Sequence, residues 1–165
     1  MPEEYVFSLR AGRKLQRIGN KASNLRLLAH KGFPIPLTYV CTWDAYVRYV
    51  QGDARVIEEL GAELSAKLEN KKWYAVRSSA NLEDGLGLSF AGQFRSVLDV
   101  QGVEEILKAV RFVWDTTRSP LIQAYLEQKG SGSQDLKMAV IIQEMVSAKV
   151  SGVSFSKNPI TGLDE

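Results

Sequence analysis

The chain has 165 residues, of which 45% are hydrophobic and 24% charged, and its 21 basic and 19 acidic residues give a formal net charge of +2. This is the composition of a globular domain that can bury a core without disulfides or metal. The small, scattered positive charge argues against nucleic acid or an anionic membrane as partner. One cysteine and one histidine exclude an internal disulfide and a zinc site of the usual Cys/His type.

The first half of the chain alternates short apolar runs with amphipathic segments. Prolines in FPIP force an extended segment there, because each proline disfavours the helical region for the residue before it. Cys41 lies in the apolar run LTYVC and is expected to be buried. In chain order we expect a strand at 5–9, a helix at 20–30, a strand at 37–41, a helix at 42–50 capped by Thr42, and a helix capped by Asp53 with Val56, Ile57, Leu60, Leu64 and Leu68 on one face.

The second half contains the most apolar strand candidates. In chain order we expect a strand at 73–78, a loop at 79–92, a strand at 93–100, a helix with Val103, Ile106, Leu107, Val110, Val113 and Trp114 on one face, a helix at 121–128, a strand at 138–146 and a second strand beside it at 150–156. Helices and strands mix without strict βαβ alternation, which favours an α+β fold. We expect one partial domain, with an N-terminal part at 1–72 and a second part at 73–165.

Residues 76–100, VRSSANLEDGLGLSFAGQFRSVLDV, have the composition of a phosphate-binding loop between two strands. The loop holds three glycines, whose backbone N–H groups can surround an anion. Arg77, near the end of the incoming strand, could place its planar guanidinium on phosphate oxygens. No Walker GxxxxGK[ST] pattern occurs. The alternative is an ordinary hairpin loop whose arginine forms a surface ion pair, and Glu83 and Asp84 weigh against a purely anion-attracting loop.

Two further segments could contact a nucleotide. RIGNKASNL places Lys21 at the start of a predicted helix, where N–H groups and the helix dipole favour anions. In the segment that follows the last buried strand, backbone groups could read the edge of an adenine while Met145 and Val146 pack on its face. The alternatives are a solvated surface lysine and a plain hairpin in the sheet core.

Together these segments resemble the N-terminal ATP-binding domain shared by phosphoenolpyruvate synthase, pyruvate phosphate dikinase and relatives that include rifampicin phosphotransferase. The motifs follow the family's order as GNKASNL, GFPIP with TWDAY, VRSSANLED, SFAGQ, QEMV and GVSFSKNPITG. Each motif alone is weak, but the ordered set covers nearly the whole chain. Asn20 replaces the second glycine of the family's GGK pattern, a mild departure because asparagine tolerates unusual backbone angles.

The resemblance implies an ATP-grasp-like fold, in which ATP lies between two α+β lobes. It implies no catalytic residue in this chain, and His30 matches no catalytic histidine of the family. The residues that it implies for the nucleotide are Lys21 and Arg77 at the phosphates, Ser89, Ala91 and Gly92 in the loop that closes over them, and Gln143, Met145 and Val146 at the adenine pocket.

In the complete enzyme the resemblance implies phosphoryl transfer from ATP through a histidine to pyruvate, with Mg²⁺ neutralising charge. The family's metal ligands lie beyond the NPxTG segment, and its phosphohistidine and pyruvate-binding domains are separate. We therefore expect no metal ligand in this chain, partners in the remaining domains, and an inactive catalyst when the chain is alone. Pyruvate, pyruvate with phosphate, and an antibiotic are all compatible as final acceptor.

The remaining expectations concern the cellular location of the protein and two alternative functions. The N-terminal residues show no basic start followed by an apolar stretch, and no apolar run approaches the about 20 residues that span a bilayer. With the lone cysteine this favours the cytoplasm. The alternative functions are a stand-alone nucleotide-binding or regulatory module without catalysis, and an interaction module that does not bind nucleotides.

Overall fold

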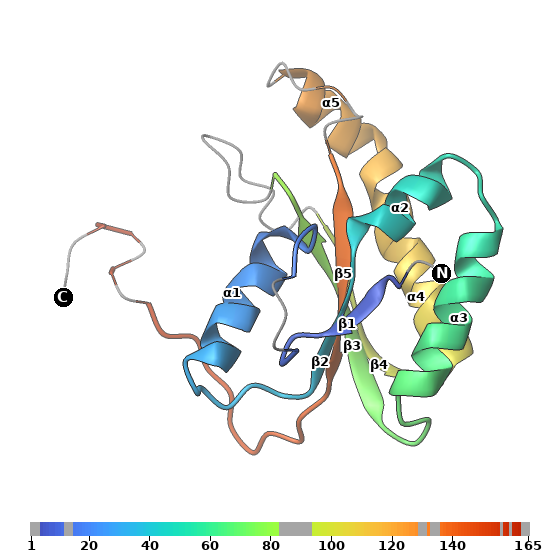
Figure 1. Ribbon diagram of the computed structural model, residues 1–165. Coiled ribbons are helices and arrows are strands. Elements are labelled where there is room, and N and C mark those ends of the chain that lie inside the picture. The colour runs from blue at the N-terminus through green and yellow to red at the C-terminus, as the bar shows by residue number, and fades with distance from the viewer. Residues whose placement is uncertain are drawn as a thin grey trace.

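The computed structural model describes residues 4–11, 15–82, 94–128, 132, 136–155, 157–158 and 160–162. Helices and strands both contribute, which confirms the expected α+β class (Figure 1). Along the chain the elements are β1 (Val6–Ser8), α1 (Gly19–His30), β2 (Thr38–Cys41), α2 (Trp43–Val50), α3 (Arg55–Lys67), β3 (Trp73–Ala80), β4 (Ser96–Gln101), α4 (Val103–Asp115), a short 3-10 helix (Thr116–Arg118), α5 (Pro120–Gln128) and β5 (Met138–Glu144).

The strands form one five-stranded sheet in the order β1-β2-β5-β3-β4, and every neighbouring pair is antiparallel. The last strand, β5, lies in the middle of the sheet, between β2 and β3. The first five residues of its sequence, MAVII, form a continuous apolar run because both faces are covered there. Since β2 pairs with β5, strands from the first and second halves of the chain share one sheet.

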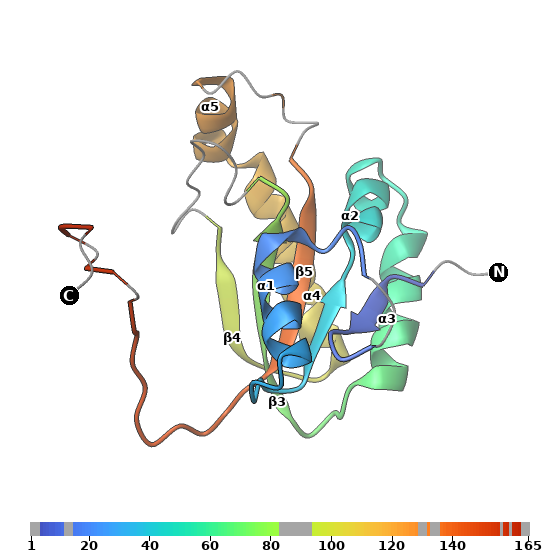
Figure 2. The ribbon, with the colours of Figure 1, turned by 60° about the vertical axis from the view of Figure 1, so that its left-hand side comes forward.

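Helices α2, α3 and α4 cover one face of the sheet, which we call the packed face, and α5 lies at one end of the sheet and packs Ile122 and Leu126 into the same core (Figures 1 and 2). The apolar residues of α3 and α4 recur at helical spacing and are buried there, as the sequence predicts. Trp114 is fully buried, and its Nε1 donates a hydrogen bond to the Met138 carbonyl at 3.2 Å. Cys41 is buried as expected, and burial raises the pKa of its thiol well above the usual range.

Among the described helices, α1 is the one that lies on the opposite face, which we call the α1 face (Figure 2). A small apolar cluster fixes it there, formed by Leu9, Ile18, Ala22, Val40, Ala139 and Ile141. Leu27 and Leu28 on the outer side of α1 stay exposed. The α1 face therefore has a much smaller core than the packed face.

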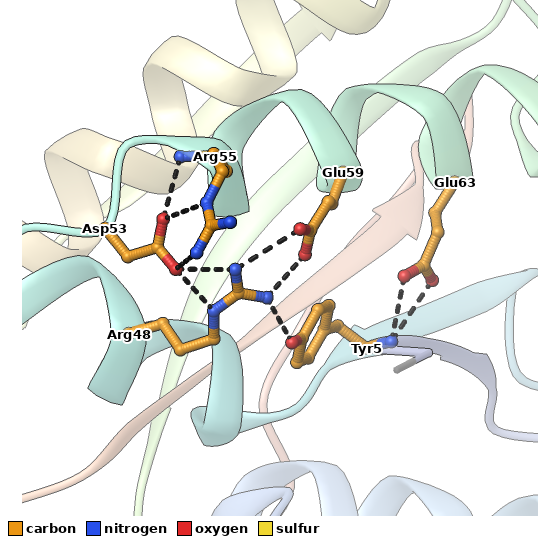
Figure 3. A network of polar contacts seen from close by, with 6 residues as sticks. All are labelled: Tyr5, Arg48, Asp53, Arg55, Glu59 and Glu63. Carbon is orange, nitrogen blue, oxygen red and sulfur yellow. Dashed lines mark hydrogen bonds and ion pairs between the residues drawn. The ribbon is translucent and has the colours of Figure 1, made fainter. Parts of the chain in front are cut away.

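A polar network at the edge of the packed face joins β1 to α2 and α3 (Figure 3). The Arg48 guanidinium donates to the carboxylates of Glu59 and Asp53 and to the Tyr5 hydroxyl, and these bonds raise the pKa of Arg48. The Glu63 carboxylate accepts two successive backbone N–H groups at the start of β1, the Tyr5 N–H at 2.9 Å. The groups of this network bond to one another within the protein, so the network holds the edge strand β1 in place.

Three expectations need correction. Thr42 stands at the N-cap of α2, but its hydroxyl is buried and makes no capping hydrogen bond. Asp53 precedes the N-cap residue Ala54 of α3 and accepts the Arg55 N–H at 3.1 Å instead of capping from the N-cap itself. Residues 150–155 form no strand: they are exposed and have no ladder partner among the described residues, so their alternating apolar pattern lacks a surface to pack on.

Candidate functional site

The N-terminus of α1 is fixed against the end of β3 by Ser79. The Ser79 hydroxyl donates to the Ile18 carbonyl at 2.8 Å and accepts the Ala22 N–H at 3.1 Å. Gly19 has a φ of +73°, and a Cβ there would lie 2.1 Å from the Ser79 carbonyl oxygen, so only glycine fits this close approach. Gly19, the glycine of the GNK motif, is thus a point of close contact between α1 and β3.

This docking brings Lys21 to the end of the strand that carries Arg77. Lys21 lies in the first turn of α1 and is half-buried. Its neighbour Ala22 faces the sheet, so the Lys21 side chain leaves the helix about 100° further round, on its flank. Arg77 precedes Ser79 by two residues on β3, and both side chains therefore point to the α1 face.

Arg77 and Gln143, predicted from separate motifs, lie side by side on this face. Arg77 Nη1 donates to Gln143 Oε1 at 3.4 Å, and both side chains are half-buried. Arg77 forms no ion pair with any described residue, and Gln143 is its one hydrogen-bond acceptor there. The guanidinium therefore keeps most of its N–H groups for another acceptor.

Sequence reasoning missed Thr38, which completes this cluster. Gln143 Nε2 donates to Thr38 Oγ1 at 2.9 Å, and the Thr38 hydroxyl donates to the Pro36 carbonyl at 2.7 Å. Thr38 is 1% exposed at the start of β2. A hydroxyl on a buried strand was the available signal, but its partner becomes visible only when β2 is known to pair with β5.

Met145 and Val146 follow the end of β5. The Met145 N–H donates to the Trp73 carbonyl at 2.8 Å, and the Val146 carbonyl accepts the Ala148 N–H at 2.9 Å. The Met145 carbonyl has no donor among the described residues and can accept a hydrogen bond from a ligand. Val146 is 63% exposed, so its side chain is accessible to a ligand.

The predicted residues follow a line along β5. Ser79 pairs with Ala139 and Arg77 with Ile141, whereas Met145 comes after the end of β5. Six residues of extended chain separate positions 139 and 145, or about 20 Å. Lys21, beside Ser79, therefore lies toward one end of this line and Met145 and Val146 toward the other, with Arg77 and Gln143 side by side between them.

A pocket of about 150 Å³ lies at the N-terminus of α1. Of its lining residues, Arg17 is paired with Asp44 at 2.7 Å. The lining residues are Leu15, Gln16, Arg17, Ile18, Gly19, Asn20, Ser23, Trp43 and Asn81.

Three of the site residues predicted from the sequence fall outside what the structure describes. Ser89, Ala91 and Gly92 lie outside the described residues. The described part of the chain gathers no group of three His, Cys, Asp or Glu side chains that could hold a metal ion. Its helices include none that is both long and apolar enough to cross a bilayer.

The sequence is similar to known phosphotransferases and related enzymes. Residues 53–165 match the family described as pyruvate phosphate dikinase, AMP/ATP-binding domain. The prodigiosin synthesizing transferase PigC of Serratia marcescens is 32% identical over 88% of this chain and 19% of its own length. The phosphoenolpyruvate synthase of Aeropyrum pernix is 28% identical over 92% of this chain and 24% of its own length.

A rifampicin phosphotransferase from a Streptomyces species is 36% identical over 72% of this chain and 14% of its own length. The chain thus spans less than a quarter of the length of each of these curated relatives. The likeness covers one part of longer proteins whose names refer to different molecules, namely prodigiosin, phosphoenolpyruvate and rifampicin.

Proposed function

The chain belongs to the family of pyruvate phosphate dikinase AMP/ATP-binding domains, and from this premise we propose that it binds ATP on the α1 face, as the nucleotide-binding part of a phosphotransferase. In the complete protein the phosphoryl group would pass from ATP through a histidine to pyruvate. The remaining domains of that protein are then the partners of this chain, and the cytoplasm is its proposed location.

One observation carries the proposal most strongly. Arg77 is a half-buried cation with no carboxylate partner among the described residues and with one weak contact to a neutral amide. A partly desolvated charge without a counter-ion is unfavourable, and a bound phosphate would compensate it through charge-assisted hydrogen bonds. The neighbouring N-terminus of α1 favours an anion at the same end of the site.

Different residues of the chain would contact different parts of ATP. Lys21 and Arg77 would neutralise the phosphates, and the Met145 carbonyl would accept a hydrogen bond from the 6-amino group of adenine. Gln143 and Val146 would line the pocket, while Ser89, Ala91 and Gly92 would belong to the loop that closes over the phosphates. Transfer of this kind relies on positioning and charge stabilisation, which is what these groups supply.

An ATP-grasp arrangement would place a second lobe over the same nucleotide. We propose that this lobe and the Mg²⁺ ligands come from outside the described residues, since those residues gather no metal-binding cluster. Mg²⁺, when bound, would neutralise phosphate charge. The chain alone is then a nucleotide-binding unit and an incomplete catalyst.

Calorimetric titration of the chain with ATP tests the site. Arg77→Ala and Lys21→Ala should each weaken binding by about 1.5–3 kcal/mol, or roughly tenfold or more, because each removes a charge-assisted bond to phosphate. The matched controls are Arg111→Ala and Lys71→Ala, which remove exposed charges elsewhere on the molecule and should leave the affinity unchanged.

Equal ATP affinity in Arg77→Ala, Lys21→Ala and the wild-type chain would refute the site assignment. No heat signal with ATP, with or without Mg²⁺, in a folded wild-type chain would favour an interaction module that does not bind nucleotides. Binding without any transfer activity, when the chain is supplied with the remaining domains, would favour a non-catalytic module.

A further inference from the structure

We propose that Thr38 is a positioning residue of the nucleotide site, which fixes the Gln143 amide in one orientation so that its carbonyl holds the Arg77 guanidinium ready for phosphate. The proposal rests on the proposed function, because it concerns how that site is prepared for ATP. Thr38 itself touches neither Arg77 nor, in this account, the nucleotide.

The direction of each hydrogen bond supports this role. The Pro36 carbonyl can only accept, so the single hydroxyl proton of Thr38 is used at 2.7 Å. Thr38 Oγ1 can then only accept, and it takes the Gln143 Nε2 proton at 2.9 Å. The other end of the amide, Oε1, is left facing Arg77, which can only donate.

The reverse orientation of the amide is unfavourable at both ends. It would turn Gln143 Oε1 toward the lone pairs of Thr38 Oγ1 and the amide N–H groups toward the guanidinium of Arg77. Two acceptors would then face each other at one end and two donors at the other. The chain from Pro36 to Arg77 is therefore consistent in only one orientation, and Thr38 sets it.

The hydrogen-bonded side chains of Thr38, Gln143 and Arg77 are held by rigid elements. They come from three neighbouring strands, β2, β5 and β3, and all lie on the α1 face. Thr38 pairs directly with Gln143 across the β2–β5 ladder and is 1% exposed, so water does not compete for its hydroxyl. Groups held by ladder hydrogen bonds and packing lose little additional freedom when a ligand arrives.

The consequence for binding is pre-organisation of a flexible side chain. An arginine side chain without a hydrogen-bond partner samples many rotamers. The conformational entropy that it loses on binding opposes affinity. One hydrogen bond from Gln143 narrows this range and leaves most of the guanidinium N–H groups for phosphate oxygens. Loss of Thr38 should therefore lower ATP affinity chiefly by releasing Gln143 and, through it, Arg77.

The first arm of the test is nuclear magnetic resonance of the nucleotide-free chain, and it needs no ligand. In Thr38→Val, which keeps the shape but not the hydroxyl, the side-chain amide signals of Gln143 and the Nε–H signal of Arg77 should shift and exchange faster with water. Thr38→Ser should restore the wild-type signals. Thermal unfolding of both variants shows whether the fold is kept.

The second arm is a double-mutant cycle with ATP as the ligand. Thr38→Val should weaken binding about 3- to 10-fold, the range of one ordinary hydrogen bond, and Thr38→Ser should bind as the wild type does. In the Arg77→Ala background, Thr38→Val should have a much smaller effect, because the guanidinium that Gln143 positions has been removed. A merely structural role would lower affinity equally in both backgrounds.

The outcomes separate the two proposals. An unchanged Arg77 signal in a folded Thr38→Val chain, or an equal effect of Thr38→Val in both backgrounds, overturns the positioning role. If Arg77→Ala binds ATP as tightly as the wild type, the proposed function fails at this site, and the first arm still decides whether Thr38 positions Arg77.

Discussion

The two faces of the sheet are built for different purposes. On the packed face, α2 to α5 bury large side chains such as Trp114, Leu60 and Met138. On the α1 face, one described helix covers a small cluster, and Arg77, Gln143 and the exposed Leu27 of α1 remain accessible. The residues that define stability and those proposed for binding are thus separated by the thickness of the sheet.

This difference shows how one strand can serve both purposes. Along β3, alternate residues point to opposite faces, so Val76 enters the large core while Arg77 and Ser79 face α1. Substitutions toward the packed face should therefore change stability, and substitutions toward the α1 face should change binding. The following predictions, in order of expected size, test this separation.

Removal of a large side chain from the packed face should have the largest effect. Trp114→Ala should lower the free energy of unfolding by about 3–5 kcal/mol, because it opens a cavity and removes the bond to Met138. Leu27→Ala on α1, where the side chain is 57% exposed, should change it by only about 0.5 kcal/mol. Urea denaturation measures both. Similar losses would mean that the two faces do not differ as described.

Gly19→Ala should separate α1 from β3. The new Cβ would meet the Ser79 carbonyl at 2.1 Å in a left-handed backbone conformation, so we expect a loss of about 2–4 kcal/mol and weaker ATP binding. Gly52→Ala is the control: its φ is +86°, but nothing lies within 4 Å, so only the backbone cost of about 1–2 kcal/mol remains. Equal stability of the two variants would show that the close approach is unimportant.

The adjacent serines of β3 give a matched pair across the sheet. Ser79→Ala leaves the buried Ala22 N–H without its acceptor and should lower the free energy of unfolding by about 1–3 kcal/mol. Ser78 faces the other way, and its buried hydroxyl has no partner among the described residues. Ser78→Ala should therefore be neutral or slightly stabilising in the same denaturation experiment. The opposite ranking would contradict the placement of α1 on Ser79.

The smallest effect is expected at Asp53, in the network of Figure 3, and only in acid. Hydrogen bonds from Arg55 and Arg48 lower the pKa of Asp53 in the folded chain. The unfolded chain therefore binds this proton first, so the stabilisation is complete above about pH 4 and is lost as the pH falls toward the lower folded pKa.

Asp53→Asn should flatten the decline in unfolding free energy between about pH 4 and pH 2 relative to the wild type. It should not change ATP affinity at pH 7, because Asp53 lies in the α2–α3 network and outside the α1-face site. An unchanged acid slope would mean that the pairing with Arg48 and Arg55 adds nothing to stability.

Much of the fold could be predicted from local patterns. Helical spacing in α3 and α4 and the apolar run of β5 identify these elements, since each pattern follows from what one element must bury. The strand expected at 150–156 does not form among residues 150–155, because a strand needs a neighbour and the sequence does not say whether one is present.

The site was predictable only in part. Arg77 and Gln143 stood out through motifs, but their contact depends on β5 lying beside β3, which no local pattern shows. Thr38 offered only a hydroxyl on an apolar strand as a signal, because its role exists only through the register of β2 with β5. The structural reason for Gly19 likewise depends on Ser79, 60 residues further along the chain.

The most direct test of the central claim is amide chemical-shift mapping of the chain during titration with ATP. The account predicts the largest shifts on the α1 face, at Gly19 to Ala22, around Arg77, and from Gln143 to Val146. Shifts confined to α3 and α4 on the packed face, or none at saturating ATP in a folded chain, would contradict it.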